Sequence, residues 1–338
     1  MDWENKVLKV GTAAVVCALV FRLLSGGLWQ RAVAFLSRPE TAAFLLYLET
    51  GRVVRPAELR QETEETTLPP ETQPTTEAAT LPPPPPPTQP AAVFSPEDAQ
   101  AVEVGNVCGY PVDIPAMLTQ SLQWDLKGEA TVLILHSHGS ECYTEPAFSD
   151  NGYRSTDTQY NVISIGDALA EQLEAAGIGV IHDRTLHDQP SYNSAYENAR
   201  EAIRENLSAH PSIRLVLDLH RDAAEGSNGQ QLAKSITVDG QQVAQLMLVV
   251  GSDAGGLSHP EWEENMALAV KLHATLEQLC PGICRPISFR TQRFNQDLSP
   301  GALIVEVGAA GNTRQEALRA AKILAQAIEH LSQGTAMS

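Results

Sequence analysis

Thr131-Val-Leu-Ile-Leu-His-Ser-His-Gly-Ser-Glu-Cys-Tyr143 joins a short apolar run directly to a run of polar and ionisable residues. Its first five residues are β-branched or leucine, as in a strand buried in a sheet, so we expect His136, His138 and Glu141 at the carboxyl end of that strand. In open α/β sheets, ligands bind at that edge. Two imidazoles and a carboxylate match the ligands of a catalytic zinc site. The alternative is a polar loop with solvated or core-satisfied histidines.

Two later apolar runs also end in ionisable residues. Residues 215–219 lead into His220 and Arg221, and residues 302–307 are apolar apart from Glu306. The carboxyl ends of parallel strands meet at one edge of a sheet, so we expect these side chains to lie near those that follow the first strand. The joint occurrence is more specific than any one of the three motifs.

The rest of the chain between residues 131 and 330 alternates between strand and helix patterns. We expect strands at 131–135, 178–181, 215–219, 244–250 and 302–307, and helices at 159–177, 193–207, 261–279 and 314–330. This alternation predicts an α/β fold with a mostly parallel sheet and helices on both faces.

A hydrolytic zinc site needs three protein ligands and an open position for water. The residues at the predicted edge that can supply them are His138, Glu141 and His220, with His136 as the alternative to His138. The metal would lower the pKa of the water and polarise the scissile carbonyl. We therefore predict Zn²⁺ as the cofactor.

Three further residues are candidates for supporting roles. Glu306 suits the carboxylate that takes the proton of water and passes it to the leaving nitrogen. Arg221 is a candidate for steadying an oxyanion or a substrate carboxylate, with a structural salt bridge as the alternative. Asp218 precedes His220 by two residues, so it can share a face with that imidazole and orient it, or be buried for unrelated reasons.

A second polar cluster, Ile181-His-Asp-Arg-Thr-Leu-His-Asp188, also follows a predicted strand. Its two His-Asp pairs offer a metal ligand or a substrate contact. We favour a hydrogen-bonded loop that supports the edge of the sheet, because buried polar groups usually have partners.

The composition excludes some classes of protein. A net charge of −18 over 338 residues argues against a nucleic-acid partner, because phosphate binding needs clustered Lys and Arg. The five cysteines have no paired CxxC spacing and indicate neither a zinc ribbon nor a dense disulfide framework.

The amino-terminal part differs from the rest. Residues 1–30 are expected to be a cytoplasmic tip and transmembrane anchor, because the apolar run from Val10 extended to Trp29 gives ~20 residues, the length that a bilayer needs. An uncleaved anchor is favoured over a signal peptide. Residues 31–55 are expected to form a membrane-proximal helix. We therefore predict a single-pass protein of the cell membrane.

Thr, Glu and Pro dominate residues 56–96, including six consecutive prolines from Pro82 to Pro87. Such a segment buries too little apolar surface to fold, so we expect a disordered, extended linker. It would hold a folded domain at 97–338 away from the membrane.

Several ordered motifs resemble the stage II sporulation protein P family, over roughly residues 132–325. They are HSHGSECY from His136, SYNSAY from Ser191, DLHRDA from Asp218 and RFNQDLSPGALIVEVGAAGNT from Arg293. The resemblance implies a membrane-anchored, zinc-dependent peptidoglycan hydrolase with amidase and endopeptidase activity, its catalytic domain lying on the extracytoplasmic side. It also implies action in forespore engulfment with the sporulation protein D transglycosylase and the sporulation protein M scaffold.

The folded part is also distantly similar to zinc N-acetylmuramoyl-L-alanine amidases. In those enzymes a His at a strand end, a Glu, a later His and a carboxylate before a Gly near the carboxyl terminus form the site. His138, His220 and Glu306 match three of these positions.

The Glu ligand departs from the amidase pattern. Where the amidases have it, near the first helix, this chain has Asp157 and Gln159. We therefore assign this ligand to Glu141, with Glu145 as the nearest alternative.

The leading hypothesis is a zinc amidase. The competing one is a non-catalytic scaffold that binds the cell wall through the same edge without turnover. A metal-free serine hydrolase using Ser137 or Ser140 is a weaker third, because no GxSxG motif supports it.

Overall fold

A computed structural model of the chain describes residues 94–122, 124–144 and 152–333. The predicted anchor at 1–30, the helix at 31–55 and the linker up to residue 93 lie outside the described residues. Within the described ranges, no helix has the length and apolar character that a membrane span needs.

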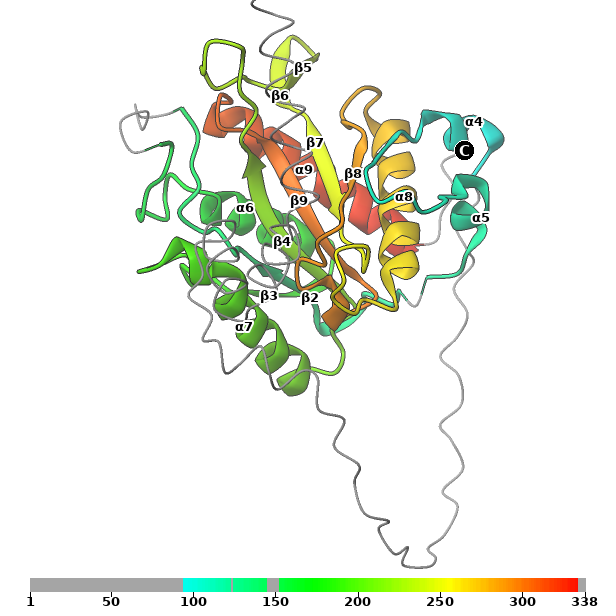
Figure 1. Cartoon of the computed structure of the whole chain (residues 1–338). Coiled ribbons are helices and arrows are strands. Elements are labelled where there is room, and N and C mark those ends of the chain that lie inside the picture. The colour runs from blue at the N-terminus through cyan, green and yellow to red at the C-terminus, as the bar shows by residue number, and fades with distance from the viewer. Residues whose placement is uncertain (1–93, 123, 145–151, 334–338) are drawn as a thin grey trace, which may run out of the picture. The chain divides into compact units, whose positions relative to one another are not determined.

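The strands form a seven-stranded sheet with the order β1-β8-β7-β9-β4-β2-β3 (Figure 1). Their bounds are β1 Val104–Asn106, β2 Gly128–Leu135, β3 Ile178–His182, β4 Leu215–Asp222, β7 Leu246–Val250, β8 Ile287–Phe289 and β9 Ala302–Ala309. Neighbouring strands are parallel, except that β7 and β9 are antiparallel. The prediction of a mixed α/β fold with a mostly parallel sheet is confirmed.

Helices cover both faces of the sheet (Figure 1). The main ones are α6 Ile163–Ala175, α7 Ala195–Ala209, α8 Trp262–Leu279 and α9 Arg314–Gln333. The larger core joins α6, α8 and α9 to one face, where Val132 and Ile134 of β2 point. Leu133 and Leu135 alternate with them and pack against α7 on the other face. This alternation explains why β2 reads as a continuous apolar run.

The remaining elements are short. They are α4 Pro96–Ala101, α5 Ile114–Thr119, the 3₁₀ turns η3 Tyr192–Ser194 and η4 Gln296–Leu298, and a separate hairpin of β5 Ser235–Val238 and β6 Gln241–Ala244. Both α4 and α5 pack on α8, and β6 packs on α9. Of these, α4, α5, η4 and β5 lie outside the elements expected from the sequence. The turn η3 overlaps the start of the helix expected at 193–207, and β6 ends at Ala244, where the strand expected at 244–250 begins.

Strand direction decides which side chains meet. Because β2, β4 and β9 are parallel, their carboxyl ends lie at one edge of the sheet, as predicted. The strand expected at 244–250 corresponds to β7, which is antiparallel to β9. The carboxyl ends of β7 and its parallel neighbours β8 and β1 therefore lie at the opposite edge. The polar residues that follow β2 are thus brought together with those of β4 and β9.

Candidate active site

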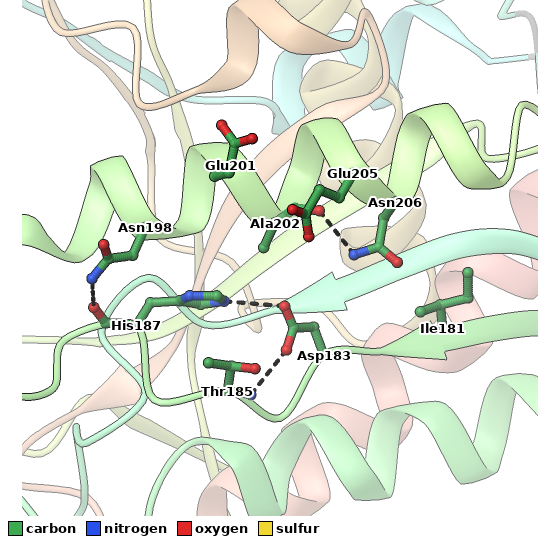
Figure 2. Close-up of a pocket in the computed structure, with 9 residues that line it drawn as sticks. All are labelled: Ile181, Asp183, Thr185, His187, Asn198, Glu201, Ala202, Glu205 and Asn206. Atoms are coloured by element: carbon green, nitrogen blue, oxygen red, sulfur yellow. Dashed lines mark hydrogen bonds and ion pairs between the residues drawn. The ribbon is translucent and has the colours of Figure 1, made fainter.

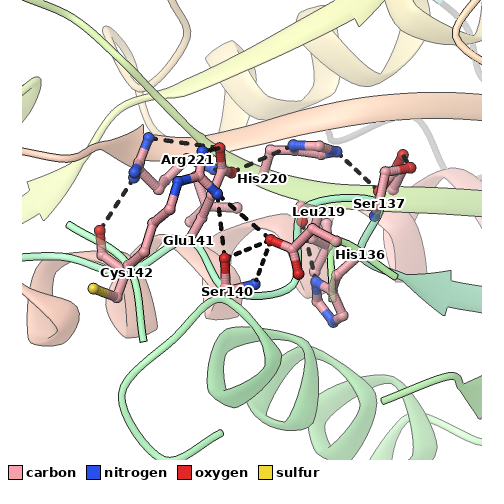
Figure 3. Close-up of polar contacts among 12 residues, drawn as sticks. His136, Ser137, Ser140, Glu141, Cys142, Leu219, His220 and Arg221 are labelled. Atoms are coloured by element: carbon pink, nitrogen blue, oxygen red, sulfur yellow. Dashed lines mark hydrogen bonds and ion pairs between the residues drawn. The ribbon is translucent and has the colours of Figure 1, made fainter. Parts of the chain in front are cut away.

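The loop after β2 meets β4 and β9 at their carboxyl ends (Figure 3). The ring centroids of His138 and His220 are 5.4 Å apart. Nδ1 of His220 lies 3.3 Å from Oε2 of Glu141. Glu306 of β9 is the register partner of His220. Four of the residues singled out in the sequence therefore gather at one place.

This loop is fastened to β9 and to the turn that follows it. The Tyr143 hydroxyl donates a hydrogen bond of 2.9 Å to the carbonyl of Val307. The Thr144 amide donates one of 3.1 Å to the carbonyl of Asn312. The loop that carries His138 and Glu141 is thereby held against the strand that carries Glu306.

His136 does not join the cluster. Its side chain is fully buried, and Nδ1 lies 3.0 Å from the carbonyl oxygen of Leu219. Its Nε2 lies 2.8 Å from Nε2 of His182. Both ring nitrogens are thus engaged within the fold, and of the two alternative ligands it is His138 that faces His220.

His220 lies between two carboxylates. Nε2 is 3.0 Å from Oδ1 of Asp218, and Nδ1 faces Glu141. Burial alone would lower the pKa of His220, but the two carboxylates raise it well above its ordinary value. The protein on its own therefore favours an imidazolium here, and Asp218 is placed to orient the ring.

The pKa values of the two glutamates of the cluster are shifted in opposite directions. Burial by itself would raise the pKa of Glu141, but the hydrogen bond with His220 and the charge of Arg221 lower it to about 2. Burial raises the pKa of Glu306 to about 8. Oε2 of Glu306 is buried and has no hydrogen-bond partner in the described part of the chain. Carboxyl groups driven apart in pKa are typical of acid–base sites.

Arg221 is buried and engaged within the protein (Figure 3). Its Nε and Nη2 donate to the carbonyls of Cys142 and Tyr153, at 3.1 and 3.0 Å. Nη1 lies 3.6 Å from Oε1 of Glu141. These contacts are those of the structural salt bridge that we weighed as the alternative to a role on substrate.

Two tyrosines flank the imidazoles, and sequence reasoning assigned them no role. Tyr192 stacks on His138 with 4.2 Å between ring centroids, and Cζ of Arg154 lies 4.4 Å from the centroid of the Tyr192 ring. Tyr196 meets His138 edge-on, with 5.3 Å between centroids. Their spacing of four residues, which puts side chains on one side of a helix, was the available signal.

The second polar cluster supports the edge, as favoured from the sequence. Nε2 of His187 lies 3.1 Å from Oδ2 of Asp183. The side chain of Asp188 accepts hydrogen bonds from the amide and hydroxyl of Ser140, next to Glu141. This loop therefore braces the residues that precede Glu141.

A cavity of about 550 Å³ separates this loop from α7 (Figure 2). Asp183 and His187 line one side of it, and Asn198 and Glu201 of α7 line another. None of the predicted metal or catalytic residues is among the residues that line it.

Whether the cluster suits zinc can be judged from its donor atoms. Within the described residues, no group of three or more His, Cys, Asp or Glu stands arranged to hold a metal ion. Nδ1 of His138, however, is buried without a hydrogen-bond partner there. The 3.3 Å between Nδ1 of His220 and Oε2 of Glu141 is close to the roughly 3.3 Å that separates two ligands of tetrahedral zinc. The imidazoles and the carboxylate are therefore of the kinds that bind zinc, and the atoms of His220 and Glu141 also have the spacing of zinc ligands.

Several solved structures are similar over most of the described domain. They include N-acetylmuramoyl-L-alanine amidase AmiC2 of Nostoc punctiforme, with 17% identity, a TM-score of 0.35 and coverage of 61% of this chain and 96% of that one. The amidase of Clostridium difficile 630 has 14% identity, a TM-score of 0.38 and coverage of 60% and 94%. Ami1 of Mycobacterium smegmatis has 13% identity, a TM-score of 0.37 and coverage of 62% and 100%. These values describe a distant likeness.

One curated protein is also similar in sequence. "Stage II sporulation protein P" of Bacillus subtilis (strain 168) is 26% identical over 218 residues, which cover 59% of this chain and 50% of the relative. This chain thus matches about half the length of that protein. A model of the family described as "Stage II sporulation protein P (SpoIIP)" matches residues 56–329, which include every strand of the sheet and the whole cluster around His220. With four fifths of its length matched in this way, the chain belongs to the stage II sporulation protein P family.

Proposed function

We propose that this protein is a zinc-dependent peptidoglycan hydrolase that cleaves the amide bond between muramic acid and L-alanine, and also peptide cross-links, during forespore engulfment. Membership of a sporulation family supports the cellular process. The arrangement of imidazoles and carboxyl groups supports hydrolysis. The competing hypothesis is a scaffold that grips the cell wall without cutting it.

The observation that carries the proposal is the state of Glu306. Its carboxyl lies beside His220 and has an oxygen without a partner among the described residues, and burial raises its pKa to about 8. A scaffold has no use for such a group, which is costly to bury. A hydrolase needs it, because a carboxyl with a pKa near neutrality both accepts and returns a proton efficiently.

The residues that would hold zinc are His138, His220 and Glu141. The chemistry that zinc supplies in such a site is a lowered pKa of water and a polarised carbonyl group. Added positive charge beside Glu306 would lower the pKa of that carboxyl, so that its ionised form accepts a proton from water. Glu306 then passes the proton to the leaving nitrogen. Asp218 keeps His220 oriented throughout.

The same proposal includes the location and partners. The amino-terminal anchor at 1–30 would hold the protein in the cell membrane, and the Pro-rich linker at 56–96 would let the domain reach peptidoglycan outside the cytoplasm. Partnership with the sporulation protein D transglycosylase and the sporulation protein M scaffold rests on the family alone.

Incubation of the purified protein with peptidoglycan, with added zinc and with chelator, tests the function. We expect new amino-terminal L-alanine groups in the zinc sample and none in the chelated one. Cleaved cross-links in the muropeptide profile would add the endopeptidase activity. Muropeptides that stay unchanged in both samples, while the protein still sediments with peptidoglycan, would favour the scaffold.

A further inference from the structure

Tyr196 lies in the first turn of α7, next to both imidazoles of the cluster. Its ring meets His138 edge-on and lies nearly parallel to His220, at 15° and 6.4 Å between centroids. It therefore projects from α7 onto the face of the sheet from which His220 and Glu306 point.

The main chain around Tyr196 is held by an unusual loop. Nδ2 of Asn295 donates a hydrogen bond of 2.7 Å to the Tyr196 carbonyl. Arg200, one turn further along α7, donates to Asn295 at 3.3 Å and to both carboxylate oxygens of Asp297 at 2.8 and 2.6 Å. These contacts fix the start of α7 against the segment that precedes β9.

That segment is strained. Phe294 and Asn295 both have positive φ, 50° and 62°, a region that costs non-glycine residues on the order of 1–3 kcal/mol. The strained turn places the Phe294 ring 5.8 Å from that of Tyr196. Strain of this kind persists where the surrounding contacts impose it, and it is often found at functional sites. Here its structural effect is to fix Tyr196.

The Tyr196 side chain is half-buried, and its hydroxyl makes no hydrogen bond within the described residues. A phenol has a pKa of about 10, so this hydroxyl keeps its proton at neutral pH and has it free to donate.

We propose that Tyr196 is a further catalytic residue, whose Oη–H donates a hydrogen bond to the carbonyl oxygen of the amide that is cut. This inference rests on the proposed function. During amide hydrolysis the oxygen of water bonds to the carbonyl carbon, negative charge grows on the carbonyl oxygen, and the C–N bond breaks as the nitrogen takes a proton. Tyr196 keeps its proton throughout and lowers the energy of the charged oxygen.

Arg221, Asp218 and Glu141 are not placed or ionised so as to donate a hydrogen bond to the carbonyl oxygen of the substrate. Arg221, the candidate from the sequence, directs its guanidinium to Cys142, Tyr153 and Glu141. The ionised carboxylates of Asp218 and Glu141 accept hydrogen bonds and donate none. Tyr196 is thus a neutral, fixed donor beside the imidazoles.

Tyr196→Phe in the full-length protein tests the proposal. We expect kcat for peptidoglycan to fall about 100-fold and KM to change by less than about threefold. Zinc content and the thermal midpoint should stay at wild-type values, because the variant loses no internal hydrogen bond among the described residues.

Tyr110→Phe is the matched control. The Tyr110 hydroxyl donates 2.9 Å to Oδ1 of Asp253, and its ring packs on Trp262 of α8. This variant loses a real hydrogen bond away from the cluster, so its thermal midpoint should fall while kcat stays at the wild-type value.

The possible results distinguish a failure of the role proposed for Tyr196 from a failure of the proposed hydrolase function. An active wild-type protein with an equally active Tyr196→Phe variant overturns the role of Tyr196 alone. A fall in kcat that follows lost zinc or a lower thermal midpoint also overturns it, since that is a structural effect. If the wild-type protein releases nothing from peptidoglycan with zinc present, both proposals fall.

Discussion

Glu306 and His220 occupy paired positions on the adjacent parallel strands β9 and β4, so their side chains emerge side by side from one face of the sheet. The backbone of the sheet sets this relationship. Either side chain can therefore be replaced by one of similar shape with little effect on the strands around it, and the effect on chemistry can be measured separately.

Glu306→Gln should abolish turnover while the protein still folds and binds zinc. Glutamine keeps the shape of the side chain but takes up no proton, so the loss of a general base should lower kcat at least about 100-fold. Release of L-alanine amino groups measures kcat, and elemental analysis measures zinc. A fully active Glu306→Gln protein would show that another group is the base.

His138→Ala and His136→Ala should differ in metal content. Removal of His138 takes away a donor that faces His220, so bound zinc should fall sharply. Removal of His136 breaks its contacts with Leu219 and His182, so stability should fall while zinc remains. Elemental analysis of folded, monodisperse protein checks both. The opposite pattern would assign the ligand to His136.

Gly166→Ala should destabilise the protein, although alanine is the better helix former by about 1 kcal/mol. A Cβ at this position in α6 would lie 2.5 Å from Nε2 of His182 and 2.7 Å from Nε2 of His136. The crowding should outweigh the gain and lower the free energy of unfolding by about 1–3 kcal/mol, as measured with urea.

A His182→Ala background is the control for this variant. With one of the two crowded rings removed, Gly166→Ala should cost clearly less. An equal cost in both backgrounds would mean that the histidine pair is not what keeps glycine there.

Lys271 should make stability depend on pH above neutrality. It is buried in α8, where Nζ donates to the carbonyl of Leu118, and burial lowers its pKa from 10.5 to about 8. Between these two values the unfolded chain holds the proton more tightly than the folded one. The free energy of unfolding should therefore rise with pH from about 8 to 10.5, by at most about 3 kcal/mol.

Lys271→Met removes that titration. The difference in unfolding free energy between wild type and variant, followed by urea denaturation across this pH range, should change steadily in favour of the wild type. If the free energies of unfolding of wild type and variant change with pH in the same way, the pKa of Lys271 is not lowered in the folded protein.

The meeting of β2, β4 and β9 was predictable because each is a mostly apolar stretch with ionisable residues near or after its end. Parallel pairing then follows from the intervening helices. The direction of β7 was not predictable, because a five-residue apolar run such as Leu246–Val250 carries no signal of direction. The three-residue strands β1 and β8 are too short to show a period.

Two features of the site depended on tertiary contacts. His136 and His138 follow the same strand, and only the position of His182 shows which of them is drawn away from the cluster. The place of Tyr196 depends on the turn at Asn295, which is distant in sequence. One missed element did have a signal, since Asp239-Gly240 between β5 and β6 is a typical two-residue hairpin turn and both residues have positive φ.

The tie between Tyr143 and Val307 has a consequence for motion. A connection between secondary-structure elements usually opens at little cost, ahead of the elements that it joins. Here the connection after β2 cannot swing out unless it also detaches from β9, so its amide hydrogens should exchange with solvent about as slowly as those of the central strands. In its dynamics, this loop is part of the sheet.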